Sequence, residues 1–390
     1  MSFSGRGREF FNMLLIGSLF QIPTFGFYRF WLITKLRRHL WANTQVAGET
    51  FEYTGTAKEL LIGFFIALAI LTPLYLGYFI LGIMLEEKAA LASLPLILIM
   101  YVLMHFGAYR ARRYRATRTV FRGVRFWMKG SGWAYAFRAI LWDFATLLTL
   151  GLALPWATAS LERYRMRHTY FGSVQGDFAG TGWDLFKRGW WVWLLGIGGM
   201  AGVIALTFNL ASANPQISEA VGGLLIVALV VIYLALWPLV MAIFGRWQIE
   251  GLRFGNVVLS SNLRARSCYG LFFKWFFSSI GFVIAFGVIV GVCAAVFGAF
   301  FQEALQGVKT EGLSSASISA FALIALAYLA LLLGMGIIQR YFFGRGLWAL
   351  IVGSITVANL QALDAVVAAG QPSGVLGEGL ADALDFNVGV

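Results

Sequence analysis

The chain alternates between long apolar stretches and short basic ones. Six stretches contain no Asp, Glu, Lys or Arg, and each is about as long as a helix that crosses a hydrocarbon core of about 30 Å. They lie at about Leu60–Leu85, Ala92–Tyr109, Gly189–Phe208, Val221–Phe244, Trp275–Phe301 and Ala320–Gln339. Such stretches must be helical because lipid offers no partner for unpaired backbone groups. They are apolar on every face, unlike the alternating strands of a transmembrane barrel. The pattern predicts an all-α integral membrane protein.

Two further apolar stretches, at about Phe10–Ile33 and Phe144–Leu161, contain residues that break helices. The first reads Pro-Thr-Phe-Gly near its centre, and the second reads Thr-Leu-Gly followed by Pro-Trp. Pro and Gly interrupt helices, and non-helical backbone at membrane depth is tolerated where protein or water covers it. We expect broken, re-entrant or interfacial segments here; the alternative is a kinked helix that spans the membrane.

The distribution of charge decides between six and eight spans. The chain has 30 Lys plus Arg against 18 Asp plus Glu, a formal net charge of +12. Eight spans would place the arginine-rich segments Arg110–Lys129 and Glu162–Arg188 on opposite sides of the membrane, against the positive-inside bias. With six spans, few basic residues fall in the outside loops, at about Glu86–Leu91, Leu210–Ala220 and Gln302–Ile318. We predict about six spans arranged as three hairpins, with the basic loops and the C-terminus in the cytoplasm.

The chain also resembles itself at an offset of 125 residues. Identical residues at this offset are Thr24, Gly26, Trp31, Leu36, Arg38, Thr44, Gly55, Thr56 and Leu60, which match Thr149, Gly151, Trp156, Leu161, Arg163, Thr169, Gly180, Thr181 and Leu185. Repeats of the same orientation imply a pseudo-symmetry axis along the membrane normal. Thr56 and Thr181 each have an acidic residue three positions later, which resembles a helix capping box.

These patterns divide the chain into five segments. Residues 1–109 form repeat unit 1, with a broken apolar segment, a basic turn and a helix hairpin, and residues 110–135 form a basic connecting segment. Residues 136–244 form repeat unit 2, and residues 245–345 form a degenerate third unit. Residues 346–390 form an interfacial segment and an acidic C-terminal tail. Its acids Asp364, Glu378, Asp382 and Asp385 are expected to dock on the arginine turns.

The basic turns and the tail carry a family resemblance. The residues that carry it are Arg113-Tyr114-Arg115, Thr119, Arg122-Gly123, Arg125-Phe126, Phe51-Glu52-Tyr53-Thr54-Gly55-Thr56, Thr149-Leu150-Gly151-Leu152, Pro155-Trp156, Arg163-Tyr164-Arg165, Phe171-Gly172 and Gly377–Asp385. They resemble the signature of the YjgN family of bacterial inner-membrane proteins. The resemblance covers nearly the whole chain and is patchiest from about Gly281 to Ala362. It implies a multi-pass protein of the bacterial inner membrane, of unknown function, with no catalytic residues to carry over.

Few residues suggest chemistry. His39 and His168 lie in basic turns, where contact with lipid head groups is expected. His105 lies in an apolar stretch, where an ionisable residue suggests function, but that stretch contains no acidic partner. Asp143 is explained by a local ion pair or an interfacial anchor. No P-loop, dinucleotide-binding glycine motif or His-Glu-x-x-His motif is present, so we predict no catalytic residue, metal or cofactor, and no enzyme activity.

Two sets of residues are candidates for function. The pathway set, taken from the repeat, is Thr24, Gly26, Trp31, Thr149, Gly151 and Trp156. The lipid-contact or partner-contact set is Arg38, Arg112, Arg113, Arg115, Arg118, Arg122, Arg125, Arg163 and Arg165. The first set favours a transporter or channel for a small or lipidic solute, because transporters place broken segments at their sites. The second favours a membrane scaffold or envelope-assembly factor, whose basic cytoplasmic face binds anionic phospholipid or proteins. Positive charge is assigned to orientation and lipid contact, so nucleic acid is not an expected partner.

Overall fold

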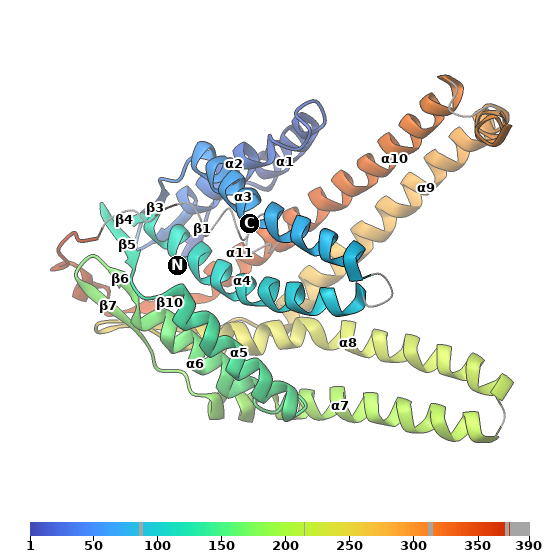
Figure 1. The fold of residues 1–390 in the computed structure, drawn as a ribbon. Helices are drawn as coiled ribbons and strands as arrows, with labels where there is room; N and C mark the ends of the chain where they lie inside the picture. The colour runs from blue at the N-terminus through green and yellow to red at the C-terminus, as the bar shows by residue number, and fades with distance from the viewer. Residues whose placement is uncertain (86–88, 214, 311–314, 371–373, 375–390) are drawn as a thin grey trace.

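The computed structural model describes residues 1–85, 89–213, 215–310, 315–370 and 374, and these residues are mostly helical. The α-helices are α1 (Gly7–Gln21), α2 (Arg29–Ala42), α3 (Ala57–Leu85), α4 (Ala89–Thr117), α5 (Gly132–Leu148), α6 (Leu154–Arg167), α7 (Gly182–Ala213), α8 (Pro215–Gly251), α9 (Ala265–Thr310), α10 (Ser315–Gln339) and α11 (Leu347–Ser354). A π-helical segment, η2 (Arg340–Gly346), joins α10 to α11, and a short 3₁₀ helix, η3 (Leu360–Leu363), lies near the end of the described chain. A curled sheet lies at one end of the molecule, and the longest helices extend away from it (Figure 1).

Within the described residues, six helical segments are long and apolar enough to cross a membrane. They are Ala57–Met84, Leu94–Thr117, Gly182–Leu210, Val221–Gly251, Ala265–Phe300 and Ser317–Ser354. Large apolar side chains on them are exposed, such as Phe208 at 75% and Leu224 at 70%. An exposed apolar surface of this extent marks a contact with a membrane or a partner, and the lengths match a membrane. The prediction of a helical multi-pass membrane protein is confirmed.

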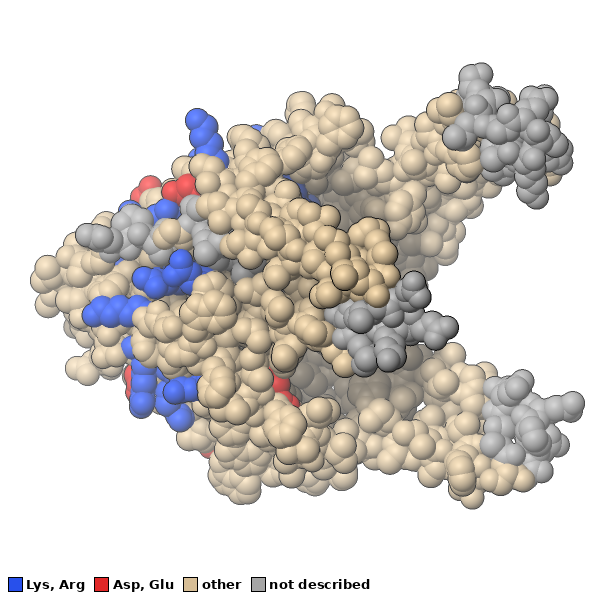
Figure 2. Space-filling model, viewed as in Figure 1, with Lys and Arg blue, Asp and Glu red and all other residues tan. Residues whose placement is uncertain are grey.

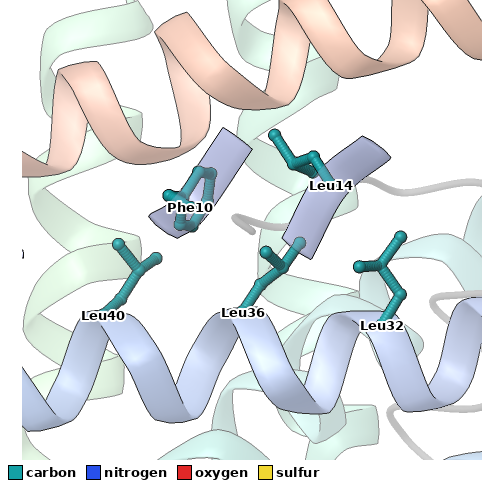
Figure 3. Packing of buried hydrophobic residues seen from close by; sticks show 5 residues of the cluster. All are labelled: Phe10, Leu14, Leu32, Leu36 and Leu40. Carbon is teal, nitrogen blue, oxygen red and sulfur yellow. The ribbon is translucent and has the colours of Figure 1, made fainter. Parts of the chain in front are cut away.

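The two broken apolar stretches form short helical hairpins, α1–α2 and α5–α6. Their helices have 14 to 17 residues and at 1.5 Å per residue reach about 21–26 Å, less than the hydrocarbon core of about 30 Å. In the first hairpin, one face of each helix is buried against the other. Figure 3 shows this contact, and the side chains in it are Phe10, Leu14, Leu32, Leu36 and Leu40. Their spacing of four residues places them on one face of each helix.

Ten short strands form a single sheet in chain order, and each pair of neighbours is antiparallel. The strands are β1 (Ser2–Phe3), β2 (Thr44–Val46), β3 (Glu49–Tyr53), β4 (Thr119–Phe121), β5 (Val124–Met128), β6 (Thr169–Phe171), β7 (Val174–Phe178), β8 (Leu252–Phe254), β9 (Val257–Ser261) and β10 (Ile355–Ala358). The sheet curls until the amino group of Met1 donates a hydrogen bond of 2.7 Å to the carbonyl of Ile355. This curled sheet, which we call the collar, was absent from the all-α prediction.

Each helical hairpin leaves the collar from one strand and returns to the next. The strands before and after a hairpin pair with each other, as β3 and β4 do across α3–α4. Two-residue turns then connect one unit to the next. Ala47 and Gly48 have φ of 50° and 88°, and Arg122 and Gly123 have φ of 51° and 72°. Positive φ at both positions is typical of type I′ turns, whose twist matches that of paired strands. The described chain is therefore a series of five strand–hairpin–strand units.

The offset of 125 residues recurs in the element bounds. Shifted by this amount, α2, β2 and β3 take the bounds of α6, β6 and β7. The predicted capping boxes are confirmed, because Thr56 Oγ1 accepts from the backbone N–H of Glu59 at 3.3 Å and Thr181 Oγ1 accepts from that of Asp184 at 3.1 Å. The predicted outside loops lie partly outside the described residues, and the tail acids Glu378, Asp382 and Asp385 lie wholly outside them.

Candidate functional site

A chamber of about 500 Å³ lies where the units meet, next to the collar. We call it the axial chamber. It is lined by Trp41, Phe51, Arg112, Arg115, Ala116, Thr119, Phe126, Met166, Thr169, Leu252, Phe254, Phe343, Gly344, Leu347, Trp348 and Ile351. These residues come from all five units, so the chamber exists only in the assembled fold. Its wall is held by the indole N–H groups of Trp41 and Trp348, which donate to Thr119 and Thr44 at 2.9 Å.

Aromatic side chains from the collar form a row that we call the floor, of which Phe51, Phe126 and Phe254 line the chamber. Phe51, Phe121, Phe171, Phe126 and Phe254 lie in that order, with successive ring centroids 4.7, 6.3, 4.7 and 5.8 Å apart. Two of these contacts are direct cross-strand pairs, because Phe51 faces Phe121 and Phe126 faces Phe171 in the register of the sheet. Apolar residues of η3 pack against the same group. The inside of the collar is thus filled with apolar side chains.

Charged groups lie at one corner of the chamber. Arg112 Nη2 lies 2.7 Å from Glu162 Oε1, and Arg165 Nη2 lies 2.6 Å from Glu162 Oε2. The side chain of Glu162 is 2% exposed. Burial alone would raise the pKa of Glu162, but the charges of Arg112 and Arg165 outweigh it and hold that pKa below its ordinary value. Arg115, one turn after Arg112 on α4, brings a second guanidinium group to the chamber wall.

Lys and Arg are gathered at the collar end of the molecule, and the projecting helices are free of them on the face in Figure 2. Most of the arginines predicted to contact lipid or a partner also have partners within the chain. Arg118 bonds Glu59, Arg122 bonds Glu49 and Asp364, Arg125 bonds the carbonyl of Thr117, and Arg38 and Arg163 bond the carbonyls of Gly55 and Gly180. The predicted docking of the acidic tail on an arginine turn is confirmed for Asp364.

Arg113 lies beside Tyr109, and its buried Nε makes no hydrogen bond. The hydrogen bonds and ion pairs of Arg38, Arg118, Arg122, Arg125 and Arg163 hold strands, turns and helix starts together. They give these arginines a structural role, and their role in contacting lipid stays a prediction.

The predicted pathway residues lie at the turns of the two short hairpins. Thr24 Oγ1 donates to the carbonyl of Phe20 at 2.6 Å, and Thr149 Oγ1 donates to that of Ala145 at 2.8 Å. Gly26 and Gly151 follow with φ of 85° and 87°, where a side chain would be strained. Both turns therefore need Thr and Gly to end one helix and start the next. A role in a pathway stays a prediction, since none of these residues lines the axial chamber.

One of these turns borders a second, apolar pocket of about 290 Å³. Gly151 lies on its rim, beside Trp190 and Trp193 of α7 and Tyr233 of α8. Trp193 Nε1 donates to the carbonyl of Leu150 at 2.9 Å and fixes the turn against α7. Of the two predicted tryptophans, Trp156 packs on Phe186 with ring centroids 5.5 Å apart, whereas Trp31 is 38% exposed.

A polar cluster between α4 and α5 was missed by the sequence interpretation. Asp143 Oδ2 lies 3.0 Å from His105 Nε2 and accepts a hydrogen bond of 2.5 Å from the hydroxyl of Tyr101. The apolar stretch around His105 contains no acidic residue, as the sequence indicated, and the acidic partner comes from the neighbouring helix. The spacing of Tyr101 and His105, four residues apart on a helix, was the available signal, but the sequence does not show which helix faces them.

Residues 1–383 match a family described as "Bacterial protein of unknown function (DUF898)". The chain belongs to this family. Among curated relatives, inner membrane protein YjgN of Escherichia coli strain K12 is 31% identical over 145 residues, which are 36% of this chain and 34% of that protein. Inner membrane protein YjgN of Salmonella typhimurium strain LT2 is 25% identical over 138 residues, which are 35% of this chain and 33% of that protein. The matches thus span about a third of the length of these relatives. No solved structure matches the chain.

The family resemblance read from the sequence is confirmed. Within the described part of this DUF898 protein, no group of three or more His, Cys, Asp and Glu is placed to hold a metal ion. The axial chamber instead offers guanidinium, hydroxyl and indole groups on aromatic and aliphatic walls. Guanidinium groups bind carboxylates, sulfonates and phosphates through charge-assisted hydrogen bonds. The arrangement is therefore suited to the reversible binding of an anion that also has an apolar part.

Proposed function

We propose that this membrane protein, located in the bacterial inner membrane, is a transporter whose axial chamber binds a small organic anion or the head of a lipidic one. The observation that carries the proposal is the position of Arg112 and Arg115 on the wall of a chamber with aromatic sides. The role is binding and movement of the solute, without an enzymatic reaction. The volume of about 500 Å³ is within the usual range for small-molecule sites, roughly 300–1,000 Å³.

The chamber favours an anion because Arg112 and Arg115 bring guanidinium groups to a wall that is otherwise largely apolar. Guanidinium groups in a low dielectric attract anions more strongly than they do in water. The aromatic floor then closes the route through the collar, since apolar constrictions can gate a pathway by excluding water. Passage through the collar requires Phe126 and Phe171 to separate. Chamber and floor together are the parts that an alternating-access carrier needs at one of its ends.

We further propose that the collar lies in the cytoplasm, that the three long hairpins span, and that the short hairpins enter from the collar side or lie at the interface. The basic residues around the collar support this orientation through the positive-inside bias. For a test, single cysteines replace Asn256 in the β8–β9 turn and Asn209 near the far end of α7, with Cys268 and Cys293 replaced by serine. A membrane-impermeant maleimide should label Asn256→Cys only from the cytoplasmic side and Asn209→Cys only from the other side. Labelling of both from one side contradicts the arrangement.

Transport is tested with purified protein in liposomes and naphthalene sulfonate, a permanently charged aromatic anion, as the probe. The wild type should take up the probe, and Arg115→Gln should reduce uptake at least tenfold, because a lost charged hydrogen bond is worth about 1.5–3 kcal/mol. Arg122→Gln is the matched control: it removes the same charge on the exposed outside of the collar, 2.6 Å from Glu49. Equal effects of the two substitutions, or no uptake above empty liposomes, contradict an anion path through the chamber.

A second candidate is a scaffold that binds anionic phospholipid. A pocket between the inner ends of α7 and α8 and the start of α9 supports it, lined by Arg188, Arg246 and Arg264 with Leu239 and Ile243. Basic pockets between transmembrane helices are typical sites for anionic head groups. Retention of anionic phospholipid by the purified protein, together with an absence of uptake of the probe, favours this function over transport.

A further inference from the structure

Two ionisable side chains and one phenol meet between α5 and the part of α4 that belongs to the candidate span Leu94–Thr117. Tyr101 and His105 lie one turn apart on α4, with their rings 4.9 Å apart and perpendicular. Both approach the same oxygen of Asp143 on α5, at 2.5 and 3.0 Å. The side chain of His105 is 15% exposed, and that of Asp143 is 41% exposed. One carboxylate oxygen thus accepts a hydrogen bond from Tyr101 and lies in close contact with the imidazole of His105.

The position of this cluster makes its charge costly. Tyr101 and His105 belong to the candidate span Leu94–Thr117, and the helix before it, α3, carries no Asp, Glu, His, Lys or Arg after Glu59. A charged side chain at membrane depth is expensive and usually marks a path for ions or protons. An anchor at the interface would not need the carboxylate to contact two side chains of another helix. The cluster therefore calls for a functional explanation.

We propose that Asp143, His105 and Tyr101 form a proton-binding site within the membrane and that its occupancy controls the axial chamber. With a neutral imidazole, the deprotonated site carries one negative charge on Asp143. One added proton, on the free imidazole nitrogen or on the carboxylate, makes the site neutral overall. Because the two groups are coupled, the proton belongs to the pair rather than to either residue. The control of the chamber rests on the proposed function, whereas the binding of the proton does not.

The geometry favours a proton over a metal cation. Hard metal cations such as calcium and magnesium bind through several oxygen ligands. This cluster contains a single carboxylate. Tyr101 donates to that carboxylate and His105 lies 3.0 Å from it, so a cation would have to displace them. The described residues contain no cluster of three or more metal-binding side chains.

The site is connected to the chamber through two rigid elements. Arg112 follows His105 by seven residues on α4, which places it on nearly the same face about 10 Å farther along. Asp143 and Glu162 both belong to the hairpin α5–α6. The contacts His105–Asp143 and Arg112–Glu162 therefore both join α4 to the hairpin α5–α6. The first contact is the proposed proton site, and the second lies at the chamber. A change of charge at the first contact alters how α4 meets the hairpin, and so alters the position of Arg112 in the chamber.

Neighbouring charged groups are engaged elsewhere. On α4, Arg110 lies over the ring of Phe106 at 6.0 Å, and on α5, Arg138 lies over the ring of Tyr164 of α6 at 4.7 Å. On α3, the ionisable side chains beyond Glu59 are tyrosines. Asp143 is thus the charged group that faces His105 from the elements packed around it in the described chain.

The test follows each of the three histidine rings by NMR during a pH titration of the full-length protein in detergent. His105 should titrate with a midpoint that moves by about one pH unit or more in Asp143→Asn, a tenfold change in proton affinity, because the nearby carboxylate favours the imidazolium. Tyr101→Phe, which keeps the ring, should shift the midpoint less. His39 and His168 should not move. The matched control Asp184→Asn, an exposed acid at the start of α7, should leave His105 unchanged.

An unchanged His105 midpoint in Asp143→Asn overturns the site. Control of the chamber is judged separately, from uptake of naphthalene sulfonate into liposomes with and without a pH gradient. A gradient should raise uptake by the wild type severalfold and have no effect in Asp143→Asn. If the histidine result holds and uptake ignores the gradient, coupling is overturned and the proton site stands. If no uptake occurs at any pH, the proposed transport function fails, and the NMR result alone decides the site.

Discussion

Replacing Glu162 with glutamine lowers the free energy of unfolding by about 3–5 kcal/mol. The substitution keeps the volume of the side chain but removes the carboxylate that lies 2.7 Å from Arg112 and 2.6 Å from Arg165. Two guanidinium groups then face each other around a buried site without a counter-charge. A charge that is left unpaired in a low dielectric is among the largest effects a single substitution can have. The change is measured by unfolding the detergent-solubilised protein with increasing sodium dodecyl sulfate.

Glu49→Gln is the control for this experiment. Glu49 Oε2 also lies 2.6 Å from an arginine nitrogen, Nε of Arg122, but the side chain of Glu49 is 51% exposed. Loss of this ion pair should therefore change the free energy of unfolding by less than about 1 kcal/mol. Similar losses for the two variants contradict the buried role of Glu162.

The dependence of stability on pH gives a second test of Glu162. The pKa of Glu162 is below its ordinary value of 4.5, so its stabilising effect is present at neutral pH and is lost as the pH falls from 4.5 through the lower, folded value. Glu162→Gln should lack that loss, and the stability of the two proteins should converge at low pH.

Replacing Phe171 with alanine is expected to destabilise the protein by about 3–5 kcal/mol. Phe171 is 2% exposed, and its ring lies between those of Phe121 and Phe126, at 6.3 and 4.7 Å. Phe171 packs within the apolar cluster that fills the collar, so its truncation leaves a cavity among these side chains. The same detergent unfolding measures the loss, and a dye that reports exposed apolar surface should bind the variant more strongly than the wild type.

Phe137→Ala tests whether the effect belongs to the collar. Phe137 lies on α5 and is 67% exposed, so its truncation removes few contacts within the chain. It should cost less than about 1 kcal/mol. A loss at Phe171 no larger than that at Phe137 would show that the aromatic residues do not hold the collar together.

The helices could be predicted from the sequence because their cause is simple and local. A hydrocarbon core demands about 20 uncharged residues in one run, and the six runs stand out without any knowledge of the fold. The capping boxes at Thr56 and Thr181 were found for the same reason, since a cap and its partner lie three residues apart.

The collar could not be predicted from the sequence because its strands are short and their partners are distant. Glu52 of β3 pairs with Val120 of β4, and a complete membrane hairpin lies between them. Strands of two to five residues show too little alternation of apolar and polar positions to be recognised. In the sequence, the type I′ turns correspond to the pairs Ala47-Gly48 and Arg122-Gly123, each of which ends in glycine. The sequence interpretation did not use them, because the surrounding arginines were explained by membrane orientation alone.

The candidate sites were missed for a related reason. Arg112 and Glu162 are 50 residues apart, and His105 and Asp143 are on different helices, so only the packing of the helices brings each pair together. The repeat did identify residues with a special conformation, because Gly26 and Gly151 have the same positive φ. The sequence could not show that this conformation serves a hairpin turn, where any sequence with the same geometry needs a glycine.

The order of strands in the collar has a consequence for how the chain is inserted into the membrane. Each newly made hairpin must deliver its returning strand next to the strand that preceded it, on the same side of the bilayer. A hairpin threaded upside down would carry its two strands to the wrong compartment and leave unpaired edges on both neighbours. A sheet with this strand order can therefore form only when every hairpin is inserted in the same orientation.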